Sequence, residues 1–284
     1  MSYQKIDVRP IAGSLGAEVH GVDLSQQLDN QTTDEIHRAF LENLVIFFRD
    51  QDISPEQQVA FTRKFGPYGP VPFVKPLDGH PEIIAVVKEA DETTTANFGG
   101  TWHSDFSFQV EPPLGSVLYA LETPAYGGDT MFANMYQAYD ALSDGMKELL
   151  DGLIAVHSAT NAYGTRARYD LNALRSMEIE TGVEGDAEME HPVVRTHPET
   201  GRKCLFVNPV YTIRFKGMAA RESAPLLTYL CEHSVRPEFT CRFRWRDKSL
   251  ALWDNRCTQH LALNDYPGFR REMHRTTIAG DRPH

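Results

Sequence analysis

The stretch Trp102-His103-Ser104-Asp105, together with the distant His260, determines which fold to expect. His103 and Asp105 are two positions apart, so on a β-strand their side chains would project from the same face. A second imidazole from a later strand, His260, would complete a triangular face of two histidines and one carboxylate. This ligand set is typical of non-haem Fe(II) oxygenases, which leave the opposite metal positions open. We therefore predict a metal site of His103, Asp105 and His260.

A metal site divided between such distant positions requires a fold that brings remote strands together. Short apolar runs bounded by Gly, Pro, Asn and Asp recur along the chain and predict strands at 44–49, 83–88, 115–121, 153–157, 239–245 and 249–253. Helices are expected at 30–44, 55–65, 135–150 and 222–233, and Leu142-Ser143 is expected to divide the third of them into two pieces. No linker divides the chain, so we predict a single domain of residues 1–284. Its fold class is mainly β with flanking helices, built on a jelly-roll or barrel core.

Composition limits the compartment and the partners. The formal net charge of −11 argues against nucleic acid and anionic membranes, which both attract clustered Lys and Arg. No apolar run approaches the ~20 residues of a membrane span, and the first residues contain no apolar signal core, so we expect a cytoplasmic protein. The cysteines form no C-x-x-C pair and are expected as free thiols: Cys204, Cys231, Cys241 and Cys257. We also expect a homo-oligomer, a dimer or a tetramer.

One long polar segment interrupts the strand pattern. Residues 161–190 are charged and lack strand periodicity, which inside a compact domain indicates either a lid or disorder. We expect a lid, whose candidates for contact with substrate are Tyr163, Arg166, Arg168 and Tyr169. Two histidines near this segment are not expected to be metal ligands. We expect His157 to be packed in the core and His197, beside a predicted hairpin turn, to be solvated.

An arginine and a threonine could complete a co-substrate site. Arg271 follows His260 at a distance that suits one strand, a turn and the next strand, so both could face one cavity. A guanidinium binds a carboxylate through two parallel hydrogen bonds, and Thr130 could add a hydroxyl donor, although an ordinary turn threonine is an equal alternative. A metal with an arginine beyond it suits a co-substrate that chelates at one end and carries a carboxylate at the other. 2-Oxoglutarate has this shape.

With these residues the chain resembles the TauD/TfdA family of Fe(II)- and 2-oxoglutarate-dependent dioxygenases. The matching stretches are Gly16-Ala17, Gly21-Val22-Asp23-Leu24, Trp102-His103-Ser104-Asp105, Gly127-Gly128-Asp129-Thr130, His191-Pro192-Val193-Val194-Arg195-Thr196-His197-Pro198, Trp253-Asp254-Asn255-Arg256 and Arg271-Glu272-Met273-His274-Arg275-Thr276. The stretches that look closer to the aryloxyalkanoate dioxygenase branch are Gly69-Pro70-Val71-Pro72, His157-Ser158-Ala159-Thr160 and Val207-Asn208-Pro209-Val210-Tyr211.

The resemblance implies a double-stranded β-helix fold and a set of cofactor ligands. Fe(II) would be held by His103, Asp105 and His260, and the distal carboxylate of 2-oxoglutarate by Arg271 and Thr130. The implied reaction uses O2, converts 2-oxoglutarate to succinate and CO2, and hydroxylates a C–H bond of the substrate. Hydroxylation beside a heteroatom then lets the product break apart.

The resemblance also implies the residues that bind the substrate. Arg275 matches the arginine that reaches a sulfonate or carboxylate, and Tyr163 and Tyr211 fall where the family has aromatic pocket residues. Val71 stands where the taurine branch has a substrate-binding histidine, and Phe73 lies close by. We therefore expect a small anionic substrate with an aromatic or apolar body, hydroxylated next to an ether oxygen.

Several alternatives remain open within and beyond this class of enzyme. The substrate could instead be a sulfonate or an alkylsulfate, as in taurine-type enzymes, or a free carboxylic acid that is simply hydroxylated. From a different class, the chain could be a catalytically silent binding module on the same β-core, or it could carry a structural zinc site. Structural zinc prefers four closed ligands, often cysteine, and no fourth ligand stands near the triad in sequence.

Overall fold

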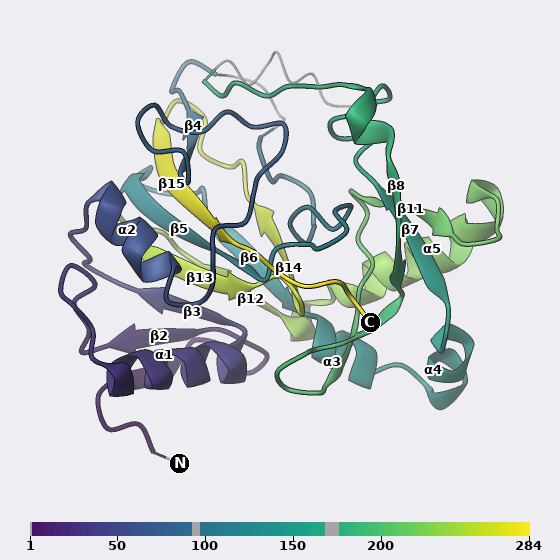
Figure 1. Cartoon of the computed structure of the whole chain (residues 1–284), viewed down its shortest axis with the longest axis horizontal. Helices are drawn as coiled ribbons and strands as arrows, with labels where there is room; N and C mark the ends of the chain where they lie inside the picture. The colour runs from purple at the N-terminus through teal and green to yellow at the C-terminus, as the bar shows by residue number, and fades with distance from the viewer. Residues whose placement is uncertain (1, 93–96, 168–175) are drawn as a thin grey trace.

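The expected strands assemble into one large sheet and several smaller ones in the computed structural model, which describes residues 2–92, 97–167 and 176–284 (Figure 1). The seven-stranded sheet has the order β1-β2-β3-β13-β5-β15-β4. Its strands are β1 (Asp7–Pro10), β2 (Ala17–His20), β3 (Val45–Phe48), β4 (Ile84–Lys88), β5 (Gly115–Glu122), β13 (Leu250–Asp254) and β15 (Arg271–Ile278). All neighbouring strands are antiparallel except β2 and β3, which run parallel.

A three-stranded sheet of order β12-β6-β14 completes the jelly roll and confirms the mainly β fold class. It consists of β6 (Thr130–Asn134), β12 (Thr240–Phe243) and β14 (Thr258–Ala262). A further sheet contains β7 (Ile154–Ser158), β8 (Glu188–Pro192) and β11 (Thr212–Phe215), and the expected hairpin is formed by β9 (Val194–Thr196) and β10 (Lys203–Leu205). The sheet of β7, β8 and β11 lies beside the jelly roll, on the side away from the N-terminus (Figure 1).

The central strands β3 and β13 of the large sheet are buried on both faces, which explains their apolar runs. In β3, Val45 and Phe47 enter the core shared with the small sheet, whereas Ile46 and Phe48 enter the core under the helices. Side chains alternate across a strand, so an apolar residue is needed at every position. Phe47 stacks on Phe243 with ring centroids 3.9 Å apart and thereby joins the two sheets.

Two helices cover the outer face of the large sheet, and their sequences explain where they begin. Asp29 accepts a hydrogen bond from the backbone of Thr32 and caps α1 (Asn30–Asn43). Ser54 and Gln57 form a capping box at the start of α2 (Pro55–Thr62). The expected helix at 135–150 is divided into α3 (Met135–Asp140) and α4 (Asp144–Leu150), and the last α-helix is α5 (Ala220–Ser234).

The long polar segment differs in part from expectation. Its last residues are not irregular, because residues 183–186 form a 3-10 helix and β8 begins at Glu188. Residues 178–180 run along the proline-rich loop of residues 66–80. The backbone N–H of Lys75 donates to the carbonyl of Glu178, and that of Glu180 donates to the carbonyl of Phe73. Arg168 and Tyr169, two of the expected substrate contacts, lie outside the described residues.

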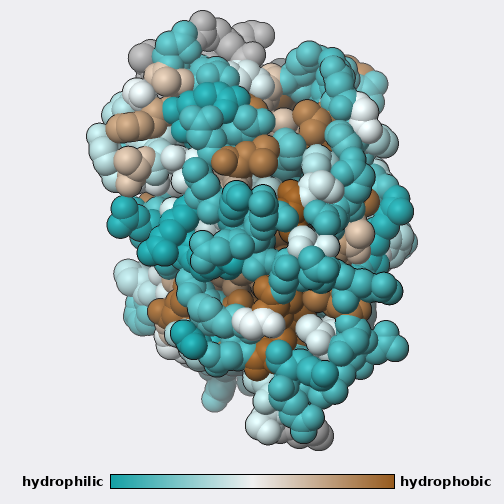
Figure 2. Space-filling model, turned by 90° about the vertical axis from the view of Figure 1, so that its left-hand side faces the viewer, coloured by the Kyte–Doolittle hydropathy of each residue, from teal (hydrophilic) through white to brown (hydrophobic). Residues whose placement is uncertain are grey.

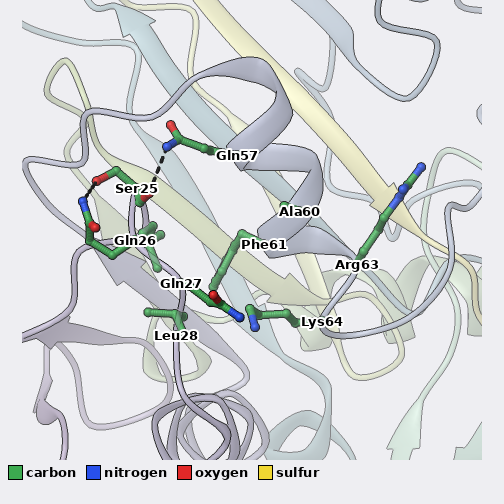
Figure 3. A pocket seen from close by; sticks show the side chains of 10 residues that line it. Ser25, Gln26, Gln27, Leu28, Gln57, Ala60, Phe61, Arg63 and Lys64 are labelled. Atoms are coloured by element: carbon green, nitrogen blue, oxygen red, sulfur yellow. Dashed lines mark hydrogen bonds between the residues drawn. The ribbon is translucent and has the colours of Figure 1, made fainter.

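None of the helices in the described part of the chain combines the length and apolar character that crossing a bilayer requires. Figure 2 shows the side that faces left in Figure 1, where the surface is mainly hydrophilic and apolar side chains gather in the lower half. An open hollow of about 410 Å³ lies between α2 and residues 24–28, where the Gln57 amide donates to the Ser25 carbonyl (Figure 3).

Candidate active site

The three predicted metal ligands meet at the edge of the small sheet. His260 lies on β14, and His103 lies directly beside it in an isolated antiparallel bridge, closed by backbone N···O hydrogen bonds of 3.1 and 2.8 Å. The conditional expectation that 102–105 is a strand is wrong, because only His103 pairs and Asp105 lies in a turn. Asp105 nevertheless faces both histidines: its Oδ1 is 3.5 Å from Nε2 of His103 and 3.6 Å from Nε2 of His260.

The histidine nitrogens are oriented as metal ligands. Nδ1 of His103 is 2.7 Å from the carbonyl oxygen of Thr101, which can only accept, so Nδ1 carries the proton and the lone pair of Nε2 faces Asp105. Burial, together with the neighbouring His103, lowers the pKa of His260 well below its usual value. The His260 ring thus presents the neutral form that binds metals.

The carboxylate of Asp105 is buried and held in its charged form. Its Oδ2 forms an ion pair with Nη2 of Arg275 at 2.8 Å and accepts a hydrogen bond from the Ser116 hydroxyl at 3.0 Å. Burial alone would raise the pKa of Asp105, but the Arg275 charge, followed by the two histidines, outweighs burial and holds the pKa well below its usual range. One oxygen is thereby fixed and the other is left free to face the imidazoles. The donors therefore suit a divalent metal ion.

Asn255 connects most groups around this carboxylate. Its side-chain oxygen accepts from the Asp105 backbone at 3.3 Å and from the Trp253 indole at 3.0 Å, while its own carbonyl accepts from the Ser104 hydroxyl at 2.6 Å. Its side-chain nitrogen lies 3.4 Å from the Ser116 hydroxyl. Sequence analysis quoted the stretch that contains Asn255 but gave the residue no role; its only sequence signal is its place in that family-like stretch.

A second cluster of potential ligands, His197, Asp254 and Cys257, is structural. His197 was expected to be solvated, and this is wrong: it is fully buried. Its Nδ1 accepts from two backbone N–H groups of the following turn, so Nε2 carries the proton and donates to Asp254 at 3.0 Å. Asp254 is also held by two side-chain hydrogen bonds from Arg256. The imidazole therefore has no lone pair left for a metal.

The two residues expected at the co-substrate carboxylate meet at one tryptophan. Arg271 begins β15, is buried, and leaves Nε and Nη2 without a hydrogen-bond partner among the described residues. Its guanidinium lies 5.9 Å from the ring of Trp245, whose indole N–H donates to the hydroxyl oxygen of Thr130 at 2.9 Å. The hydroxyl proton of Thr130 remains available for donation. Sequence analysis did not single out Trp245.

The four expected pocket residues form one cluster beside the triad. Val71, Phe73, Tyr163 and Tyr211 pack together with Phe108 and its neighbours in a single apolar cluster. Phe73 stacks on Tyr163 at 5.2 Å between ring centroids. Tyr211 lies 5.0 Å from Phe108 and 6.5 Å from the ring of His103, again between centroids. An aromatic wall thus reaches the metal ligands.

A buried polar network supports this wall from behind. The Ser107 hydroxyl lies 3.0 Å from Nδ1 of His157 and accepts a hydrogen bond from the Asn208 side chain at 3.0 Å. The side-chain oxygen of Asn208 in turn accepts from the backbone of Tyr211 at 2.9 Å. His157 is fully buried, which confirms its interpretation as a packed core residue.

Fold and site together define a class of protein: a jelly-roll oxygenase with a site for one metal ion held by two histidines and one carboxylate. The model of the family described as "Taurine catabolism dioxygenase TauD, TfdA family" matches residues 7–277, and the chain belongs to that family. It is a 2-oxoglutarate-dependent dioxygenase whose cofactor is Fe(II) and whose co-substrates are 2-oxoglutarate and O2.

Curated relatives match nearly the whole chain. It is 36% identical to an alkylsulfatase of Acinetobacter baylyi, over 98% of this chain and 86% of the relative. It is also 36% identical to an alpha-ketoglutarate-dependent sulfate ester dioxygenase of Pseudomonas putida, over 98% and 91%. A 2,4-dichlorophenoxyacetate dioxygenase of Cupriavidus pinatubonensis is 34% identical, over 96% and 97%.

Two solved structures agree with the fold. A putative alpha-ketoglutarate-dependent taurine dioxygenase from Burkholderia xenovorans superposes with a TM-score of 0.82 at 39% identity, covering 98% of this chain and 94% of that one. AAD-2 in complex with Mn(II) and N-oxalylglycine has a TM-score of 0.78 at 30% identity, covering 99% of both chains.

Proposed function

We propose that this dioxygenase hydroxylates a small anionic substrate with an aromatic or apolar body, similar to an aryloxyalkanoate, at the carbon next to an ether oxygen. The single observation that carries the proposal is the aromatic wall of Phe73, Phe108, Tyr163 and Tyr211 beside the metal ligands. Insertion of one oxygen atom into that C–H bond gives a hemiacetal. The hemiacetal collapses by breaking the C–O bond, so that a phenol leaves and a carbonyl remains.

Separate groups of residues bind the metal, the co-substrate and the substrate. His103, Asp105 and His260 hold Fe(II), which when bound supplies the activation of O2 coupled to conversion of 2-oxoglutarate to succinate and CO2. Arg271 and Thr130 bind the distal carboxylate of the co-substrate and so fix its orientation. The aromatic wall orients the body of the substrate and excludes water from the reacting carbon.

Arg275 is proposed to bind the anionic group of the substrate. It is buried beside the pocket, with its Nη2 on Asp105 and its Nε without a partner among the described residues. Val71, at the position of the taurine-branch histidine, packs into the apolar cluster and offers no polar contact. The anion is therefore bound by one arginine, and the rest of the substrate contacts apolar surface.

The segment 161–190 is proposed to be the lid over this pocket. Its described residues supply three members of the apolar cluster, Ala162, Tyr163 and Ile179. Gly182 donates a backbone hydrogen bond to the carbonyl of Tyr163. Tyr163 also stacks on Phe73 of the proline-rich loop. The lid and that loop thus each contribute one ring, Tyr163 and Phe73, to the aromatic wall beside the triad.

A sulfate ester of an alkyl alcohol is the second candidate substrate. It is favoured by the relatives named alkylsulfatase and sulfate ester dioxygenase, each 36% identical over nearly the whole chain. Hydroxylation at the carbon that bears the ester oxygen would release sulfate and an aldehyde. The two candidates share an anion, an apolar body and a C–H bond next to oxygen.

The products distinguish the candidates. Enzyme loaded with Fe(II) and 2-oxoglutarate in air is supplied separately with an aryloxyacetate, an alkyl sulfate, an alkanesulfonate and a free carboxylic acid. The proposal predicts the highest kcat/KM for the aryloxyacetate, with one phenol formed per succinate. Preferred release of sulfate would establish the second candidate, and preferred release of sulfite or of a stable alcohol would contradict both.

A further inference from the structure

Two buried cations stand directly opposite each other at the co-substrate end of the site. Lys88 on β4 pairs with Arg271 on β15 in the antiparallel register. Residues directly opposite in such a pair project from the same face with their Cβ atoms about 5 Å apart. Both side chains are largely buried, 8% exposed for Lys88 and 6% for Arg271. They line one small cavity together with Tyr266, Phe98 and Met177.

Neither cation forms an ion pair within the part of the chain that the structure describes. The Lys88 ammonium donates to the side-chain oxygen of Asn264 and lies 4.5 Å from the centre of the Tyr266 ring, and both of these partners are neutral. Two guanidinium nitrogens of Arg271 are unpartnered among the described residues. The positive charge of this cavity is therefore uncompensated by any close carboxylate.

The acidic side chains that act on this pair from a longer range each give one oxygen to another partner. Glu92, which acts on Lys88, accepts hydrogen bonds from Ser176 through Oε1, and its buried Oε2 has no hydrogen-bond partner among the described residues. Asp129, which acts on Arg271, is ion-paired through Oδ2 with Arg242 at 2.6 Å, and its Oδ1 is likewise without a partner among these residues. Two like charges opposite each other on neighbouring strands are destabilising, and burial increases the cost. An anion between them would convert this cost into attraction.

We propose that Lys88 is a second cation of the 2-oxoglutarate site, which acts with Arg271 on the distal carboxylate and selects dicarboxylate over monocarboxylate 2-oxo acids. This inference rests on the proposed role of Arg271. Arg271 supplies the directional hydrogen bonds through its two free nitrogens. Lys88 adds a charge held in place by Asn264 and Tyr266, and it strengthens binding without touching the metal end of the co-substrate.

The test compares two 2-oxo acids that differ at one end. Anaerobic titration of the Fe(II)-loaded protein follows the visible charge-transfer band and gives Kd for 2-oxoglutarate and for 2-oxopentanoate, which lacks the distal carboxylate. For Lys88→Gln we expect Kd for 2-oxoglutarate to rise about tenfold, because one buried charge contact is lost. Kd for 2-oxopentanoate should stay the same. Lys88→Arg should keep both values, and the exposed Lys64→Gln is the matched control.

A second measurement, made on metal-free protein, distinguishes loss of the Lys88 charge from misfolding of the variant. Glutarate, added to metal-free protein, should raise the Tm of the wild type. It should raise the Tm of the Lys88→Met variant by a smaller amount. If Lys88→Gln and Lys88→Met leave 2-oxoglutarate affinity unchanged, or weaken both 2-oxo acids equally, Lys88 is only a structural cation and the inference is overturned. If instead Arg271→Ala leaves 2-oxoglutarate affinity intact, the proposed co-substrate site itself is wrong.

Discussion

At the scale of single residues, the carboxylate of Asp105 is fixed by its surroundings before any metal arrives. Arg275 and Ser116 hold one of its oxygens, and Asn255 holds its backbone. Outer contacts of this kind orient a metal ligand, and their loss typically weakens metal affinity by about 10- to 100-fold.

Asn255→Ala is therefore expected to weaken Fe(II) binding by about tenfold or more. The substitution removes the acceptor of the Asp105 backbone and leaves the Trp253 indole unpaired, so it should also lower the free energy of unfolding by about 1–3 kcal/mol. Anaerobic titration with Fe(II) and chemical denaturation measure the two effects separately. Unchanged metal affinity in a folded variant would show that Asn255 does not position the ligand.

Arg271→Ala should separate the co-substrate from the metal. Its Nε and Nη2 have no hydrogen-bond partner among the described residues, so truncation breaks no hydrogen bond of these two nitrogens within the protein while it removes their contact with 2-oxoglutarate. Losing a buried charged partner costs about 2–5 kcal/mol, which raises the KM for 2-oxoglutarate by roughly 30-fold or more. Iron content, measured after gel filtration, should stay at the wild-type level. Loss of iron would mean that Arg271 supports the metal site instead.

His157 should make the protein sensitive to acid. Burial, with a smaller contribution from His191, lowers its pKa from 6.5 to about 3. Between these values the unfolded chain binds a proton that the folded chain excludes, so stability falls as pH falls, by about 1.4 kcal/mol per pH unit. The substitution His157→Gln removes the group that binds this proton. The wild type should lose stability more steeply than the variant from pH 6.5 towards pH 4 in urea titrations, and equal slopes would contradict the assignment.

At the scale of elements, local sequence determined most helices and strands. The cap of α1 at Asp29 and the capping box of α2 were readable because their donors and acceptors are three residues apart. The strand expected at 102–105 failed because the Asp105 backbone bonds to a distant side chain instead of a ladder, and Phe106 then turns the chain with a φ of 45°. No pattern in the sequence around residues 102–105 indicates that the side chain of Asn255 lies beside Asp105.

The segment 161–190 is predicted to close over the pocket when the site is filled. Arg166, which is exposed in the first described part of this segment, is a suitable cleavage site for trypsin. Cleavage there should slow when Fe(II), 2-oxoglutarate and substrate are added together, because closure would protect the backbone around Arg166. The same rate with and without ligands would show that the segment is not a lid. Cleavage at Lys64, an exposed residue far from the segment in sequence, is the internal control.

At the scale of the whole molecule, the two distant parts of the metal site meet because the jelly roll brings β14 against residues 101–103. The sequence predicted the fold class. It also named the three residues of the triad and the aromatic side chains that the structure brings together, since each rests on residue types in a recognisable pattern. The tertiary contacts around the site were not predicted. The burial of His197, the hydrogen bond from Trp245 to Thr130 and the pairing of Lys88 with Arg271 depend on packing and strand register. The same dependence explains why an exposed-looking histidine beside a turn became a core residue.

The most direct test of the central claim is anaerobic addition of Fe(II) and 2-oxoglutarate to the metal-free protein. A site of His103, Asp105 and His260 with Arg271 beyond it should give the weak visible charge-transfer band of the chelate, and His260→Ala should abolish it. Shifts of that band on adding aryloxyacetates, alkyl sulfates or sulfonates would then report substrate binding beside the metal. Absence of the band in folded, iron-loaded wild-type protein would contradict the account and favour a catalytically silent binding module.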